Sequence, residues 1–367
     1  MRIALLTSSR ADLGIQRPLI RALASDPDIQ LTVIAFGSHL DPRFGMTIDE
    51  VRASHSGDLL ELPPVLKEDA PADIGLAMAA TMEQFTAVWK DGTYDRIVAL
   101  GDRYEMFSAV YASVPFGIPI AHIHGGETTK GAIDNAFRNA ITHAASMHFV
   151  AAEPYRKRVI EMLGHDEGVH LTGALSIDNL RELELFDTRE ILERTGVDLE
   201  RPTLLITYHP ETIDRASWER DWSVLEQVLR DTAGEFQALV TLPNADTGGL
   251  QLRQRWTDLA REQAHVTAVD SLGARLYLSC MAHCSMMLGN TSSGYIEASF
   301  FPKHVIDLGE RQTGRMVTSN IRRCPMDAGT ILEAVAMAGS APPPAVDHPY
   351  GDGHAAERMV ERLKTKA

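Results

Sequence analysis

Short apolar runs alternate with amphipathic stretches along most of the chain. The first apolar run covers residues 2–7 (RIALLT), and the next covers residues 30–36. Uninterrupted apolar runs of this length are typical of strands buried on both faces of a parallel sheet, and apolar residues at helical spacing lie between them. The alternation therefore predicts repeated βα units, an α/β fold with parallel sheets and helices on both faces.

The same alternation continues to the last helix. We expect further strands at residues 59–62, 97–100, 118–123, 147–151, 169–172, 203–208, 238–242, 266–268, 286–288 and 304–308. We expect helices at residues 74–89, 176–195, 218–230, 249–262, 274–283, 293–300, 328–337 and 355–366. The pattern breaks at residues 196–202 and then restarts, which predicts two Rossmann-like domains, residues 1–175 and 176–345, with an interdomain cleft. Residues 346–367 then form a linker and a final helix.

Composition narrows the class of protein. The 367 residues include 44% hydrophobic and 23% charged residues, which is ordinary for a globular protein. Because 50 acidic residues outweigh 35 basic ones, for a net charge of −15, we expect no nucleic-acid partner. Three cysteines make no disulfide framework, which favours a reducing compartment. With no run of about 20 apolar residues and too short an apolar start for a signal peptide, we expect a cytoplasmic protein without membrane association.

Three carboxylates are candidates for acid–base chemistry. Asp102 and Glu127 each follow an apolar run, and Asp134 begins a predicted helix. Ligands of parallel α/β sheets bind outside the carboxyl ends of the strands, and carboxylates gathered there raise one another's pKa. A structural alternative is local pairing, of Asp134 with Arg138 and of Asp102 with Arg103. Glu127 is the hardest to explain structurally, because the two glycines before it add no packing.

A loop of small residues is a candidate phosphate-binding site. The segment that contains Asn290, Ser292, Ser293 and Gly294 leaves a predicted strand and opens a predicted helix. Backbone N–H groups, the helix dipole and two hydroxyls favour a phosphate there, and Glu297 is placed to accept from two ribose hydroxyls. An ordinary capped helix is the structural alternative.

Further polar residues follow other strands. His209 and Asn244 come directly after the predicted strands at 203–208 and 238–242 in the second half. Arg10 follows the first strand, and Arg315 follows the last. Histidine and arginine donate well to a diphosphate, and polar residues at several neighbouring strand ends favour a shared site more strongly than one alone. Each of these side chains also has a plain alternative as a solvated loop residue.

Two other pairs of residues are weaker candidates for a catalytic or metal-binding role. His122 and His124 alternate on a predicted strand near the carboxylates, which suits either a metal or ordinary hydrogen bonding, and we favour hydrogen bonding. Cys280 and Cys284 lie on an apolar predicted helix and are expected in the core. We expect no metal.

Six motifs in this order carry a resemblance to a known family: GDRYEMF, HIHGGE, HPET, LPNAD, GNTSSGYIEA and ERQTGR. With them the chain resembles the hydrolysing UDP-N-acetylglucosamine 2-epimerases of bacterial sialic-acid and related nonulosonic-acid pathways. The non-hydrolysing relatives carry a different segment in place of HIHGGE. The resemblance implies a glycosyltransferase-B-like fold, in which the last helix often packs back on the N-terminal domain.

The resemblance also implies a reaction. A base removes the C2 proton as the C1–O bond to UDP breaks, and water adds to the resulting glycal to give N-acetylmannosamine. Asp102, Glu127 and Asp134 inherit the catalytic roles. The nucleotide and substrate contacts fall to Arg10, His209, Asn244, Asn290, Ser292, Ser293, Gly294, Glu297 and Arg315. No cofactor is implied, and we expect a homo-oligomer, a dimer or tetramer.

Three alternatives remain open from the sequence. One is the same reaction on a nucleotide-linked N,N'-diacetylbacillosamine, which is a step towards legionaminic acid. A second is a glycosyltransferase of the B fold, which shares the nucleotide loop but needs no group of three carboxylates. A third is an inactive nucleotide-sugar sensor, which the presence of all three carboxylates disfavours.

Overall fold

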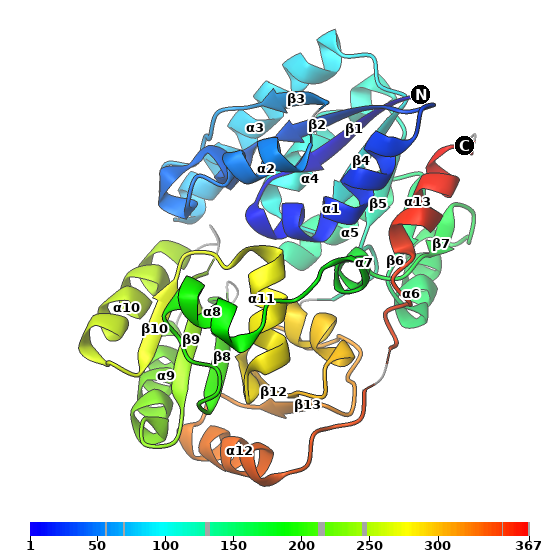
Figure 1. Cartoon of the computed structure of the whole chain (residues 1–367). Helices are drawn as coiled ribbons and strands as arrows, with labels where there is room; N and C mark the ends of the chain where they lie inside the picture. The colour runs from blue at the N-terminus through cyan, green and yellow to red at the C-terminus, as the bar shows by residue number, and fades with distance from the viewer. Residues whose placement is uncertain are drawn as a thin grey trace. The chain divides into compact units, whose positions relative to one another are not determined.

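The chain forms two compact units. The computed structural model describes residues 1–55, 57–68, 70–128, 133–211, 217–243, 248–346 and 348–365. The first unit contains Met1–Glu127, Asp134–Glu182 and Tyr350–Ala367, and the second contains Thr128–Ile133 and Leu183–Pro349. Both are built on a fully parallel sheet, as the βα alternation predicted (Figure 1).

The first unit has a seven-stranded sheet in the order β3-β2-β1-β4-β5-β6-β7. Its strands are β1 (Arg2–Thr7), β2 (Gln30–Ala35), β3 (Asp58–Glu61), β4 (Arg96–Leu100), β5 (Ile120–Ile123), β6 (Met147–Val150) and β7 (Val169–Leu171). The chain reverses direction across the sheet between β1 and β4, which is a topological switch point of the kind where α/β folds bind ligands.

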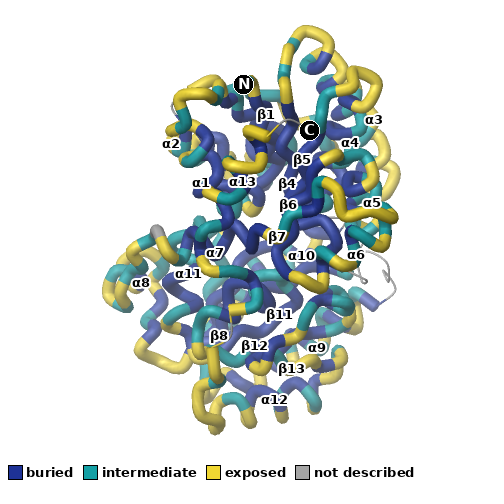
Figure 2. The backbone as a smooth tube through the Cα atoms, turned by 90° about the vertical axis from the view of Figure 1, so that its right-hand side faces the viewer, coloured by how far each residue is buried: buried dark blue, intermediate teal, exposed yellow. Residues whose placement is uncertain are grey.

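Helices cover both faces of this sheet. They are α1 (Arg10–Ser25), α2 (Ile48–Ser54), α3 (Pro71–Asp91), α4 (Tyr104–Tyr111), α5 (Asp134–Ala144), α6 (Glu153–Leu163), α7 (Leu175–Glu182) and α13 (Ala355–Leu363), with 3-10 turns at Gly37–Leu40, Pro42–Phe44 and Val114–Phe116. Because successive strand residues point to opposite faces, Leu5 packs with α1 and α13, and Leu6 packs with α3, α4 and α5. The hydrophobic cores on the two faces of the sheet are buried along the strands (Figure 2).

The C-terminal helix belongs to the first unit. α13, drawn in red in Figure 1, packs against α1 and α7. Asp178 on α7 accepts hydrogen bonds from the backbone N–H groups of Ala355 and Ala356, at 3.0 and 2.7 Å. These are donors that the first turn of a helix leaves without an intrahelical partner. Met359 and Leu363 then fill the core beside α1.

The second unit has a six-stranded sheet in the order β10-β9-β8-β11-β12-β13. Its strands are β8 (Thr203–Thr207), β9 (Gln237–Thr241), β10 (Val266–Val269), β11 (Met286–Gly289), β12 (His304–Leu308) and β13 (Ile321–Cys324). Its helices are α8 (Thr188–Thr195), α9 (Trp218–Thr232), α10 (Gly249–Glu262), α11 (Gly273–His283) and α12 (Ala328–Ser340). α9, α10 and α12 cover one face, and α8 and α11 cover the other.

The structure corrects two predicted helices. The helix expected at residues 176–195 is two helices, α7 and α8, and Asp187 begins the second with a capping box to Glu190. The helix expected at 293–300 is two 3-10 turns, Ser292–Gly294 and Glu297–Phe300. The segment keeps its backbone N–H groups. No long α-helix follows them, so the helix dipole expected at this site is absent.

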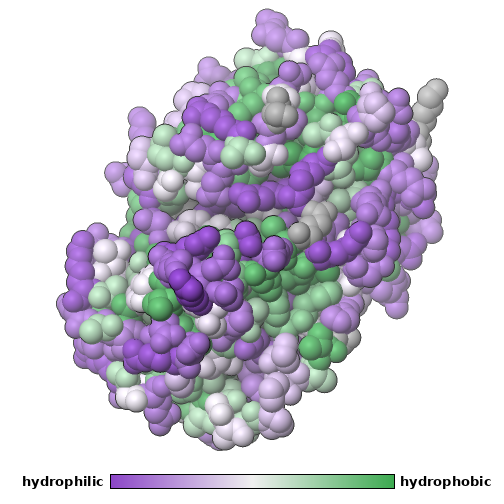
Figure 3. Space-filling view, in the orientation of Figure 1, coloured by the Kyte–Doolittle hydropathy of each residue, from purple (hydrophilic) through white to green (hydrophobic). Residues whose placement is uncertain are grey.

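The face of the molecule seen in Figure 3 carries both hydrophilic and hydrophobic residues. Large apolar side chains that are exposed, such as Leu76 and Leu171, lie on different elements. Across the described residues, none of the helices combines the length and the apolar character needed to span a bilayer.

Candidate active site

In the first unit, the ends of β4 and β5 bring polar groups to one edge of the sheet. The strands pair in parallel, with Leu100 opposite Ile123, so the residues that follow them are neighbours. Asp102 follows β4 after a glycine with a φ of +80°, and His124 follows β5 with a φ of +66°. A positive φ is uncommon for a residue with a side chain and is often found at functional sites.

Arg138 on α5 joins these strand ends. Its Nη2 donates to Oδ2 of Asp102, and its Nη1 donates to the backbone carbonyl of His124 at 2.7 Å. The same Nη1 lies 3.9 Å from Oε2 of Glu127. One buried guanidinium therefore holds Asp102 and Glu127, two of the three predicted carboxylates, in one cluster. This geometry uses the fixed fork of arginine donors, which lysine lacks.

His124 and Glu127 are in direct contact within that cluster. Nδ1 of His124 lies 2.6 Å from Oε1 of Glu127, and the two residues are 6% and 2% exposed. The contact requires a tight turn through the two glycines between them. A Cβ on Gly126, whose φ is +78°, would lie 2.5 Å from the backbone oxygen of Tyr155. The glycine pair thus has a structural reason, which is to bring Glu127 back to His124.

His122 supports the cluster from inside the sheet. Its Nε2 lies 2.8 Å from the carbonyl oxygen of Gly101, and its Nδ1 lies 3.1 Å from Oγ1 of Thr142. Burial lowers the pKa of His122 to about 3, so the ring is neutral. The alternation of His122 and His124 on one strand face does not hold, because β5 ends at Ile123.

The other two predicted residues of this unit lie at helix starts. Asp134 is the first residue of α5 and is half-buried. Arg10 is the first residue of α1, directly after the N-cap Ser9. A carboxylate in the first turn of a helix is stabilised by the helix dipole, whereas a cation there is not, so Arg10 gains nothing from its own helix.

In the second unit, His209 and Asn290 are locked together at the ends of β8 and β11. The two strands pair in parallel, with Thr207 opposite Gly289. Oδ1 of Asn290 accepts from the backbone N–H of His209 at 2.7 Å, and its Nδ2 donates to the His209 carbonyl at 2.8 Å. Asn290 is fully buried, so its amide joins the two loops.

A hydrogen-bond chain extends this joint to the loop after β12. Nε2 of Gln312 donates to the carbonyl of Asn290 at 2.7 Å, and Nε of Arg315 donates to Oε1 of Gln312 at 2.5 Å. Both residues are buried. The predicted cation Arg315 is therefore fixed to the same loop as Asn290 through Gln312, a residue that the sequence did not single out.

The small-residue loop presents its hydroxyls beside a tyrosine. Ser292 and Ser293 are half-buried, whereas Glu297 is 8% exposed. The hydroxyl of Tyr277 on α11 lies near Ser293 and 3.4 Å from Oγ1 of Thr207, and burial raises the pKa of that hydroxyl. Gly294 is required by packing, because a Cβ there would lie 2.9 Å from Cγ1 of Val305. Asn244, the remaining predicted contact, lies outside the described residues.

Behind this loop, a chain of polar side chains anchors it to β12 and β13, with Tyr295 and Asp307 buried and Arg323 exposed. The hydroxyl of Tyr295 donates to Oδ2 of Asp307 at 2.6 Å, and Nε of Arg323 donates to that hydroxyl at 3.1 Å. Burial raises the pKa of Asp307 to about 6. The anchor fixes the loop one residue beyond Gly294.

Similarity to known proteins extends over nearly the whole chain. The sequence profile described as UDP-N-acetylglucosamine 2-epimerase matches residues 21–364. The chain belongs to the UDP-N-acetylglucosamine 2-epimerase family. The hydrolysing branch indicated by the HIHGGE segment is confirmed, because curated relatives that match most of the chain are named as hydrolysing enzymes.

Two of those relatives exceed 30% identity. The GDP/UDP-N,N'-diacetylbacillosamine 2-epimerase (hydrolyzing) of Campylobacter jejuni is 32% identical, over 87% of this chain and 83% of its own length. The UDP-N,N'-diacetylbacillosamine 2-epimerase (hydrolyzing) of Legionella pneumophila is 31% identical, over 99% and 96%. The crystal structure of UDP-GlcNAc 2-epimerase from Neisseria meningitidis bound to UDP-GlcNAc is 18% identical, with a TM-score of 0.81 and 99% of each chain covered. This likeness confirms the glycosyltransferase-B-like fold.

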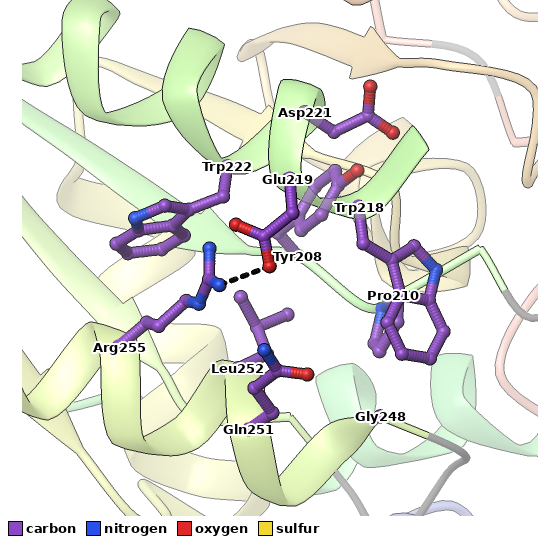
Figure 4. Close-up of a pocket in the computed structure, with 10 residues that line it drawn as sticks. All are labelled: Tyr208, Pro210, Trp218, Glu219, Asp221, Trp222, Gly248, Gln251, Leu252 and Arg255. Carbon is purple, nitrogen blue, oxygen red and sulfur yellow. Dashed lines mark hydrogen bonds and ion pairs between the residues drawn. The ribbon is translucent and has the colours of Figure 1, made fainter. Parts of the chain in front are cut away.

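This family member also has a pocket that the sequence did not suggest. Figure 4 shows it between α9 and α10, where Glu219 and Arg255 point towards each other and Trp222 lies beside Arg255. Its cavity volume of about 30 Å³ holds water but not a nucleotide sugar. The pocket is therefore not the substrate site itself, although Tyr208 and Pro210, which flank His209, line it.

Potential metal ligands and thiols are arranged as follows in the described part of this family member. No group of three or more His, Cys, Asp or Glu side chains in it has the arrangement of a metal site. Cys280 and Cys284 are buried in the core beside α8, where burial raises the pKa of each thiol to about 12. Thiols with so high a pKa are poor nucleophiles and metal ligands.

Proposed function

We propose that this enzyme converts UDP-N,N'-diacetylbacillosamine to UDP and the free 2-epimeric sugar by elimination and hydration. The arrangement that supports acid–base chemistry is the cluster of partly buried Asp102 with buried Glu127 and Arg138 at the sheet edge of the first unit. A glycosyltransferase needs donors for the diphosphate but not such a cluster. Family membership adds that the chemistry takes place at C2 of a nucleotide sugar.

The relatives favour this sugar over UDP-N-acetylglucosamine. Those above 30% identity are named for diacetylbacillosamine, whereas the Neisseria meningitidis protein named UDP-N-acetylglucosamine 2-epimerase is 25% identical over 92% of this chain. UDP-N-acetylglucosamine, which gives N-acetylmannosamine, remains the second candidate. The two substrates share the nucleotide and the reacting carbons, which are the parts that the six sequence motifs are expected to contact.

This proposal gives the residues two separate roles, acid–base catalysis and nucleotide binding. Asp102, Glu127 and Asp134 supply the carboxylates of the acid–base site, and these carboxylates stabilise positive charge at C1. The nucleotide is held by Arg10, His209, Asn244, Ser292, Ser293, Gly294, Glu297 and Arg315, with Asn290 aligning the His209 loop. Negative charge grows on the diphosphate as the C1–O bond breaks, so fixed donors stabilise the transition state more than the ground state.

A panel of nucleotide sugars tests the proposal. The enzyme is incubated with UDP-diacetylbacillosamine, its GDP analogue and UDP-N-acetylglucosamine, without any acceptor, in deuterated water. We expect the fastest UDP release from UDP-diacetylbacillosamine and one deuterium at C2 of an inverted product, read by NMR. Release that requires an added acceptor sugar would point to a glycosyltransferase, and a faster reaction of UDP-N-acetylglucosamine would select the second substrate.

A further inference from the structure

We propose that His124 is a catalytic residue of this enzyme, the base that removes the C2 proton, and that Glu127 acts through it as a positioning residue. The inference rests on the proposed function and names the atom that performs its first step. The roles of the two residues are thereby the opposite of those predicted from the sequence motif, in which Glu127 is catalytic and His124 is only a hydrogen-bonding neighbour.

The contact with Glu127 fixes which nitrogen of His124 is basic. A carboxylate can only accept, so Nδ1 of His124, 2.6 Å from Oε1 of Glu127, must carry the proton. In the neutral ring the lone pair is then on Nε2. Arg138, with Nη1 3.9 Å from the other oxygen of Glu127, places positive charge beside the carboxylate. This is the logic of a histidine base oriented by an acidic partner.

Nε2 of His124 is buried and has no hydrogen-bond partner among the described residues. An unpaired buried polar atom costs roughly 1–3 kcal/mol. The same residue has a φ of +66°, which costs a similar amount for a residue with a side chain. Two such costs in one residue are explained if the free nitrogen meets the substrate.

The charges around the ring suit proton transfer. Glu127 contacts its Nδ1, and Arg138 lies beside Glu127 and also bonds Asp102. His122, two residues before His124, is neutral because burial lowers its pKa to about 3. A cation formed at His124 is therefore stabilised by Glu127 and opposed mainly by Arg138.

Atoms and electrons balance in this reaction. The Nε2 lone pair takes the C2 proton, the C2–H electron pair forms the C1–C2 double bond, and the C1–O pair leaves with UDP. A carboxylic acid on the opposite side then protonates C2, while water supplies a hydroxyl to C1 and its remaining proton restores that acid. Asp102 and Asp134 are the candidates for that acid. The histidine returns its proton to solvent.

Two substitutions separate the roles of His124 and Glu127. His124→Asn keeps an N–H near the position of Nδ1 and tolerates a positive φ, but it has no basic nitrogen. Glu127→Gln keeps an acceptor for Nδ1–H and loses the charge. We expect kcat to fall about 1,000-fold in His124→Asn and about 10- to 100-fold in Glu127→Gln, within the range of general-base catalysis. The double variant should be no slower than His124→Asn, because the two act as a unit.

Wild-type enzyme and a matched control are assayed alongside. His148 on β6 is another buried histidine whose Nδ1 has no partner in the described structure. His148→Asn should keep kcat within threefold, and all variants should bind UDP within tenfold of wild type by calorimetry. Imidazole added to His124→Gly should restore turnover, which a purely structural histidine would not allow.

These assays separate a failure of the proposed function from a failure of the proposed role of His124. If wild-type enzyme releases no UDP from any nucleotide sugar, the proposed function fails, and this inference fails with it. If wild type is active but Glu127→Gln is at least as slow as His124→Asn, and imidazole restores nothing, Glu127 is the base and the inference alone is overturned.

Discussion

The amide of Asn290 pairs with both backbone groups of His209, although 81 residues separate them in the chain. Gly289, just before Asn290, makes the approach possible, since a Cβ there would lie 2.1 Å from the backbone oxygen of Thr207. The first residues of the loops after β8 and β11 are thus held together. A diphosphate bound to both would meet donors that need no rearrangement, which lowers the cost of binding.

Replacing Asn290 should weaken nucleotide binding without touching the first unit. Asn290→Ala leaves the N–H and carbonyl of His209 unpaired, at a cost of roughly 1–3 kcal/mol. We expect the Kd for UDP, measured by calorimetry, to rise at least tenfold. Gln254→Ala on the exposed side of α10 is the control and should bind like wild type. Unchanged UDP affinity in Asn290→Ala would show that the His209 loop takes no part in binding.

Arg138→Lys tests the bridge between the carboxylates. A lysine ammonium is a single point charge and cannot reach Asp102, Glu127 and the His124 carbonyl together. We predict a 10- to 100-fold loss of kcat with little change in UDP affinity. Arg156→Lys on α6, a partly exposed arginine, should leave both constants as they are. A loss of UDP binding in place of kcat would instead place Arg138 with the nucleotide.

Much of this fold could be predicted from the sequence because strands of parallel sheets are continuous apolar runs. That pattern placed β4 and β5 and therefore predicted that Asp102 and Glu127 lie at one sheet edge. β13 was missed, because its middle residues Arg322 and Arg323 are exposed on an edge strand and break the apolar run. Such a strand is defined by its neighbour, β12, and not by its own composition.

The side-chain partners were harder to predict than the elements. The sequence left local pairing of Arg138 with Asp134 as an alternative, but Arg138 bonds Asp102, 36 residues away, and the His124 carbonyl. The expected helix at 293–300 divides into short turns, with Tyr295 between them bonded to Asp307. Both depend on contacts between distant segments, which periodicity along the chain does not encode.

Asp307 should make the second unit less stable as the pH rises. Its folded pKa of about 6 lies above the unfolded value of 3.8, so its contribution is complete below about pH 4 and is lost as the pH rises through 6. The difference is at most about 3 kcal/mol. Asp307→Asn should therefore gain stability relative to wild type between pH 4 and 7. Urea denaturation followed by tryptophan fluorescence suits this unit, since Trp218, Trp222 and Trp256 lie in it. A constant difference across this range would contradict the prediction.

The first unit should instead be labile to acid. Burial lowers the pKa of His39 and His122 to about 3 and that of His148 to about 4. Since these values lie below the unfolded 6.5, the stability is present above pH 6.5 and is lost as the pH falls. At pH 5 each histidine accounts for about 2 kcal/mol of that loss. Urea denaturation followed by far-UV circular dichroism at pH 7.5 and 5.0 measures it, and His148→Asn should show a smaller drop than wild type.

Substitution of Gly126 tests the turn that positions Glu127, and substitution of Gly164 is the matched control. Both have a left-handed backbone, with φ of +78° and +79°, but a Cβ on Gly164 would meet no atom within 4 Å. Gly164→Ala should therefore cost only about 1 kcal/mol, from the backbone alone. In Gly126→Ala the new Cβ also meets the Tyr155 carbonyl at 2.5 Å, so the turn must shift and move Glu127 away from His124. We expect a larger loss of stability by thermal denaturation and a fall in kcat of at least 100-fold. Equal effects of the two substitutions would mean that the turn tolerates a side chain and does not set the position of Glu127.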